Sequence, residues 1–199
     1  MRIDEVIKVP TITKKKTAHL DVLPNDGKPI PRGETEEYLG THVGDIRPDA
    51  QVWTYRTGNF INYVVYNPET RISHLACSGT RYPNNPNSLI IHGLYSGPKN
   101  DIRASSFYYW LIKNLGLTLV SDYKQSEGGH RVWQDLEKRY GKFINIHGFN
   151  TKTNEPINVG ARDDTETHIP YTDIENAPAG MRQELASLGK DVRLVASPK

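Results

Sequence analysis

Residues 51–149 carry most of the regular apolar patterning in this 199-residue chain. Residues 51–56 alternate polar and apolar side chains, and residues 60–66 are rich in the β-branched and aromatic types that strands favour. After a polar turn, residues 71–77 alternate again. We therefore predict a hairpin here, followed by a mostly apolar strand over 88–95 that is covered on both faces.

Two amphipathic segments alternate with short strands in the second half of this region. Residues 102–115 and 127–140 repeat apolar side chains at helical spacing, and a glycine follows each segment. Short strands are predicted at 117–120 and 142–149. Helical crossovers of this size join neighbouring strands of a sheet. The order predicts an α+β or α/β fold, with a mixed, mostly antiparallel central sheet flanked by helices.

The two ends of the chain are polar and rich in turn-forming residues. Residues 1–50 and 150–199 are predicted to form extended segments around a core domain of residues 51–149. Only 36% of the chain is hydrophobic, which is low for a globular protein and fits long extensions. Within the C-terminal segment we predict a short helix at 181–188 and a last edge strand at 191–196.

Cysteine and histidine usage limits the chemistry of the chain. The single cysteine, Cys77, excludes an internal disulfide and a cysteine-based zinc site. The seven histidines lack the tight spacing of metal ligands, so no metal site is expected. A secretion signal would have an apolar run of about 7–15 residues near the N-terminus. The sequence shows none there, so we do not expect a secretion signal. No apolar run reaches about 18 residues, so we expect a cytoplasmic protein without a membrane span.

The order of elements from His92 to Phe149 resembles the GNAT superfamily of acyl-CoA-dependent N-acyltransferases. Segments 119–122 (LVSD), 125–129 (QSEGG) and 132–138 (VWQDLEK) are most similar to the divergent GNAT-like proteins of tailed bacteriophages. The likeness covers about a third of the chain. It implies transfer of an acyl group from acetyl-CoA or another acyl-CoA to an amine, in the cytoplasm of a phage host.

The resemblance also implies a phosphate-binding loop at the start of the first helix. In the family, a glycine-rich loop presents backbone N–H groups and a helix start to the pyrophosphate of coenzyme A. Here the matching window begins with Asp101, which would repel phosphate or instead cap the helix, and both interpretations stay open. The implied cofactor-binding residues are Lys99, Arg103, Ala104, Ser105 and Ser106, with Ser126 at the start of the second helix.

Asp122, His92 and a tyrosine are the candidates for catalysis. Asp122 ends a central strand at the side of an α/β sheet where ligands collect, with the capping of a turn as the alternative. His92 is a candidate base, and a satisfied core histidine is the alternative. The family's proton-donating tyrosine corresponds to Trp133, whose indole is a poor acid. Tyr108 or Tyr140 could replace it, with core packing as the alternative.

Two other functions compete with the enzyme. A GNAT-like protein that no longer uses the cofactor could act by binding, as a phage structural or host-interaction factor in the virion or the host. Its terminal extensions would then contact a protein partner or a second copy of the chain. Nucleic acid is a weaker third candidate ligand. The 25 basic and 23 acidic residues nearly cancel in charge, and the short run Lys14–Lys16 is better explained as a solvated basic surface.

Overall fold

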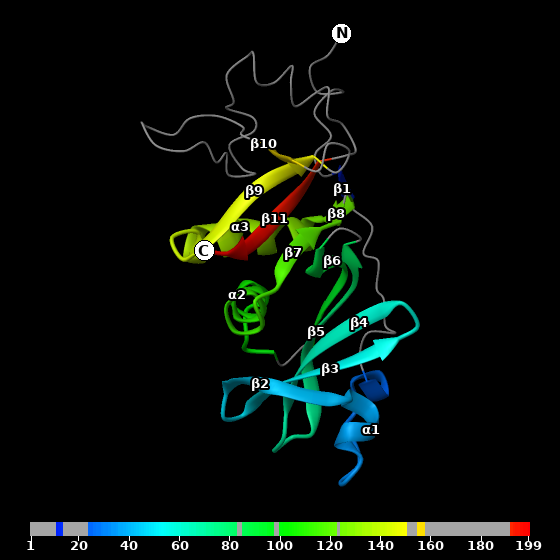
Figure 1. The fold of residues 1–199 in the computed structure, drawn as a ribbon. Helices are drawn as coiled ribbons and strands as arrows, with labels where there is room; N and C mark the ends of the chain where they lie inside the picture. Colours follow the sequence, from blue (N-terminus) through cyan, green and yellow to red (C-terminus); the bar gives the residue numbers. More distant parts are fainter. Residues whose placement is uncertain are drawn as a thin grey trace. The chain divides into compact units, whose positions relative to one another are not determined.

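The computed structural model describes residues 11–13, 24–82, 85–97, 100–122, 124–150, 155–157 and 192–199. The chain divides into two compact units (Figure 1). The N-terminal unit comprises Thr17–Leu111, and the C-terminal unit comprises Met1–Lys16 together with Ile112–Lys199. The division falls inside helix α2 (Ala104–Leu115). The helix predicted at 181–188 and the lysine run at 14–16 lie outside the described residues.

An antiparallel meander of five strands forms the sheet of the N-terminal unit. Each strand pairs with the next along the chain. The four strands after the first confirm the predicted hairpin and apolar strand, whereas the first was not predicted because glycine and polar residues dominate it. In chain order the strands are β2 (Thr41–Arg47), β3 (Ala50–Thr57), β4 (Phe60–Asn67), β5 (Ile72–Tyr82) and β6 (Asn85–Ser96).

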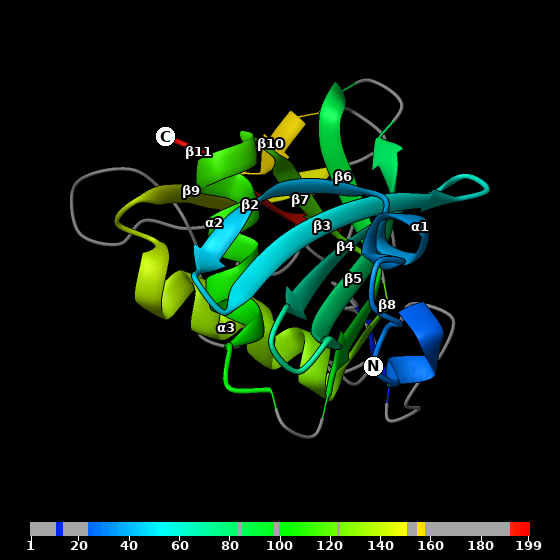
Figure 2. The same cartoon turned by 90° about the horizontal axis from the view of Figure 1, so that it is seen from below.

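Both faces of this sheet are buried. On one face, Trp53, Val64 and Ala76 pack in a cluster with residues from the 3-10 helix η3 (Pro24–Gly27) region and from α1 (Thr35–Leu39), which lies against the strands in Figure 2. The opposite face carries buried Val52, Val65, Leu75 and Cys77. Helix α2 contributes buried Phe107 and Tyr108 to the core. This double cover explains why β4 reads as an almost continuous apolar run.

Helix α1 stops at Gly40, where the chain must pass very close to the sheet. Gly40 has a φ of 73°, and its N–H donates to the carbonyl oxygen of Glu36 at 2.8 Å. A Cβ atom on Gly40 would lie 2.5 Å from the carbonyl oxygen of Thr54 in β3. The position therefore needs glycine for its left-handed conformation and also for space.

Gly40→Ala should lower the free energy of unfolding by roughly 2–4 kcal/mol, of which about 1–2 kcal/mol is left-handed strain and the remainder is the displacement of β3. Urea denaturation followed by circular dichroism measures this. Gly58→Ala is the matched control, because Gly58 also has a positive φ, 57°, but no atom lies within 4 Å of its added Cβ. Equal losses in the two variants would show that the close approach to Thr54 costs nothing.

The C-terminal unit pairs its last strand between two earlier ones. Strand β11 (Val192–Pro198) is antiparallel to both β7 (Thr118–Ser121) and β9 (Ile144–Asn150). The predicted edge position of the last strand is therefore wrong, and so is the expectation that the strands joined by the second helix are neighbours. The physical reason is that β11 supplies three consecutive buried apolar residues at 194–196, which an edge strand does not need.

This unit also contains a fourteen-residue helix and three further short strands. Helix α3 (Glu127–Tyr140) lies between β8 and β9 in the chain and agrees with the predicted range. Strand β10 (Glu155–Ile157) pairs with β9, and the short strands β1 (Thr11–Thr13) and β8 (Lys124–Ser126) pair in parallel. The mostly antiparallel sheet with helices confirms the α+β class. None of the described helices has the length and apolarity needed to cross a membrane.

Candidate functional site

The loop between β6 and α2 is the expected phosphate-binding segment, and Asn100 organises it. Its Oδ1 accepts the N–H of Ile102 at 3.0 Å, while its Nδ2 donates to the carbonyl oxygen of Ile102 at 2.6 Å and to Ser96 Oγ at 3.0 Å. The N–H of Phe107 donates to the carbonyl oxygen of Arg103 at 3.1 Å. The helix therefore opens one residue after Arg103, later than the predicted start at 102.

Asp101 does not cap α2, so the capping interpretation is wrong. Its Oδ2 accepts a hydrogen bond from Arg47 Nη2 at 2.5 Å, and Arg47 Nε donates to Asp49 Oδ1 at 2.7 Å. The hydrogen bond from the Arg47 guanidinium, together with its charge, lowers the pKa of the Asp101 carboxyl. Since the carboxylate is paired, its repulsion of a nearby anion is reduced.

The implied cofactor-binding residues differ in how much surface they offer. Arg103 is exposed, Ala104 and Ser106 are half-buried, and Ser105 is 2% exposed. Among the described residues of this window, Arg103 is therefore the positively charged side chain that an anion from solvent can reach. Lys99 lies outside the described residues.

Asp122 follows the last residue of β7, and two neighbouring strands hold it in place. Its Oδ1 lies 3.6 Å from Nη1 of Arg193 in β11, with both side chains partly exposed. The same Nη1 donates to the carbonyl oxygen of Ser121 at 3.0 Å, and Ser121 Oγ accepts the N–H of Leu194 at 2.9 Å. Ser126 ends β8 directly before α3, and its side chain is outside the described part.

His92 lies on the surface of β6, so the core-histidine interpretation is wrong. Its Nε2 is 2.9 Å from Thr80 Oγ1, and its ring meets Phe60 edge-on with centroids 5.9 Å apart. The β5–β6 ladder slips between Ser78 and Gly79, and such a bulge changes which side a residue faces. Strand β6 is consequently not covered on both faces at this point.

The aromatic and thiol candidates lie in the core. Tyr108 is 2% exposed, and burial raises the pKa of its phenol well above the ordinary value. The burial of Tyr108 confirms the core-packing alternative. Trp133 is also buried. Burial raises the pKa of the Cys77 thiol to about 12, so the thiolate needed for nucleophilic attack is scarce.

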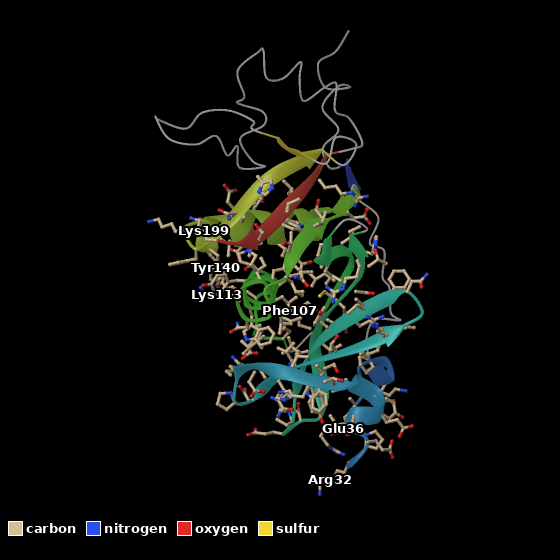
Figure 3. All side chains as sticks on the ribbon, viewed as in Figure 1. Arg32, Glu36, Phe107, Lys113, Tyr140 and Lys199 are labelled. Carbon is tan, nitrogen blue, oxygen red and sulfur yellow. The ribbon has the colours of Figure 1, made fainter. Side chains whose placement is uncertain are left out.

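Two hollows of the N-terminal unit were not anticipated. The smaller hollow, about 200 Å³, is lined by Asp101 and His74 among others. The buried Nε2 of His74 has no hydrogen-bond partner among the described residues. The larger, about 600 Å³, lies within the size range of ligand sites. Arg32 and Glu36 on its rim are labelled in Figure 3. The larger hollow is lined by Arg32, Gly33, Thr35, Glu36, Gln51, Trp53, Tyr66, Pro68, Glu69 and Arg71.

The reason these features escaped prediction is that their residues come from distant segments. Arg193 is separated from Asp122 by most of the C-terminal half, and no local pattern links them. Arg47 lies in the strand that the sequence did not predict. Within the described ranges, no group of three or more histidine, cysteine or acidic residues could hold a metal ion.

Comparison of the chain with protein-family models, with curated proteins and with solved structures finds no match in any of the three.

Proposed function

We propose that the chain is a GNAT-like N-acyltransferase that moves an acyl group from acyl-CoA to an amine. The observation that carries the proposal is the segment between the apolar strand β6 and the twelve-residue helix α2. There Arg47 pairs with the one acidic residue of the window, and Arg103 is exposed next to the helix start. A helix start with an adjacent guanidinium suits the phosphates of coenzyme A.

Asp122 is the proton acceptor in this proposal. The amine nitrogen attacks the thioester carbonyl carbon, the C–S bond breaks, and the amine proton passes to the Asp122 carboxylate directly or through water. Arg193 restrains that carboxylate from the neighbouring strand at 3.6 Å. The leaving thiolate takes its proton from solvent, because Tyr108 is buried.

Acetyl-CoA at about 100 times its Kd should raise the Tm by about 5–10 °C, because a ligand that binds only the folded state stabilises it by mass action. Differential scanning fluorimetry measures the shift. Arg103→Glu should remove most of it, whereas Arg56→Glu, which alters another exposed arginine, should retain it. The absence of a shift with acetyl-, succinyl- and long-chain acyl-CoA at millimolar concentration would contradict cofactor binding.

A binding protein without turnover is the second candidate, and the burial of Tyr108 and Trp133 favours it. Neither aromatic residue can donate a proton to a thiolate in an open cleft. Residues 1–50 or 150–199 would then contact a protein partner or a second copy. The absence of a Tm shift with a panel of acyl-CoA esters at millimolar concentration, together with no release of CoA thiol, would favour this candidate.

A further inference from the structure

The C-terminal end of α3 gathers exposed cations around one exposed aromatic ring. Lys138 and Arg139 occupy the last turn of the helix, and Lys142 and Phe143 follow it directly. Lys199, which follows β11, lies beside them in space, because its Nζ donates to the carbonyl oxygen of Lys142 at 2.9 Å. All five side chains are exposed. We call these five residues the α3-end surface.

Helix stabilisation explains only part of this charge. Lys138 and Arg139 interact favourably with the negative end of the helix dipole, and Arg139 Nε also pairs with Asp135 Oδ1 at 2.6 Å. Lys142 and Lys199 lie beyond the last helical turn, where the helix dipole contributes less. The whole chain has a net charge of only +2, whereas this end of α3 carries four cations against Asp135 and Glu137, so positive charge is locally in excess. Lys113 is labelled on the same side as Lys199 and Tyr140 in Figure 3.

The exposed ring of Phe143 indicates which class of negatively charged partner this surface binds. It is 57% exposed, and the only other exposed large hydrophobic side chain in the described part of the chain is Phe60, at 43%. One ring buries too little apolar area to anchor the protein in a bilayer, where stable binding needs several apolar groups. One ring is enough to stack on one base, and lysines beside it neutralise the flanking phosphates.

From this combination we infer that the α3-end surface binds single-stranded nucleic acid. Unstacked bases offer their faces to an aromatic side chain, whereas a duplex hides them. Recognition rests on stacking and phosphate contacts, so binding is tolerant of sequence and strongly dependent on salt. The inference does not rest on acyl-CoA binding, since it uses neither the β6–α2 loop nor Asp122.

Fluorescence anisotropy of the full chain with a labelled 20-nucleotide oligothymidine tests the inference. Phe143→Ala should weaken binding by about 5- to 100-fold, the range expected for loss of one stacked base. Phe60→Ala removes the other exposed phenylalanine and should leave the Kd unchanged. Replacing Lys138 and Lys142 with alanine should flatten the plot of log K against log salt by about 1.4, that is, about 0.7 for each lost phosphate contact. Lys28→Ala is the control for an exposed lysine elsewhere.

Four results would overturn the inference. The first is no binding of oligothymidine at low salt. The second is binding that Phe143→Ala and the double lysine variant leave intact, which would assign it to another surface. The third is equal or tighter binding of polyglutamate or of phosphatidylserine vesicles, because the partner would then be an acidic protein or a membrane. Equal binding of a duplex of the same length would likewise exclude the stacking role of Phe143.

Discussion

Asp122→Asn is expected to lower the rate of acyl transfer by about 100- to 10,000-fold, the usual contribution of a positioned proton acceptor. Asparagine has the same shape but cannot take up the amine proton. Arg193 would keep its hydrogen bond to the carbonyl oxygen of Ser121, so the pairing of β7 with β11 should persist. Release of the CoA thiol gives the rate, and the Tm reports whether the variant is folded.

Asp135→Asn is the matched control for this experiment. Asp135 is also a partly exposed aspartate paired with an arginine of the same unit, Arg139, but it lies on α3 away from the end of β7. It should keep the parent rate. If Asp122→Asn turns over as fast as the parent protein, Asp122 is not the proton acceptor. If the parent protein neither releases CoA thiol nor gains Tm with acyl-CoA, the binding candidate is favoured.

Phe107→Ala is expected to lower the free energy of unfolding by about 3–5 kcal/mol, because it deletes a ring from a closely packed core and leaves a cavity. Phe107 has no exposed surface and is among the largest fully buried side chains of the chain. A loss of this size is a large fraction of the stability of an ordinary domain. Urea denaturation followed by tryptophan fluorescence measures the change in midpoint.

Phe60→Ala is the control for the core variant, since Phe60 is 43% exposed at the start of β4. Its loss should stay within about 0.5 kcal/mol, as for most surface substitutions. A Phe107→Ala loss as small as that of Phe60→Ala would mean that α2 contributes little to the core. The acyl-CoA proposal would then lose the rigid helix start on which it relies.

Local patterns predicted most elements, because strand and helix periodicities are written in neighbouring residues. The ranges 51–56, 60–66, 102–115 and 127–140 all correspond to observed strands or helices. Strand β2 escaped prediction since it lies at the edge of the meander and has no fully buried residue, so it needs few apolar residues. The start of α2 was misplaced because Asp101 has the chemistry of a cap yet bonds Arg47 instead.

The candidate site was predicted less completely than the fold. The sequence singled out Asp122 from its place at a strand end, and the structure adds Arg193, which no spacing rule connects to it. The orientation of His92 depends on a slip in the β5–β6 ladder, which period-two reasoning cannot anticipate. Tyr108 illustrates the opposite case, since its helical spacing already placed it beside core residues.

By itself, the sequence determined the positions of most elements and a mostly antiparallel sheet with helices, because strand and helix periodicities are local. Only the tertiary structure decided that β11 lies between β7 and β9, that Arg47 and Arg193 restrain two aspartates, and that Lys199 joins the end of α3. Pairings between distant segments depend on how the whole chain packs, and no local interaction encodes them.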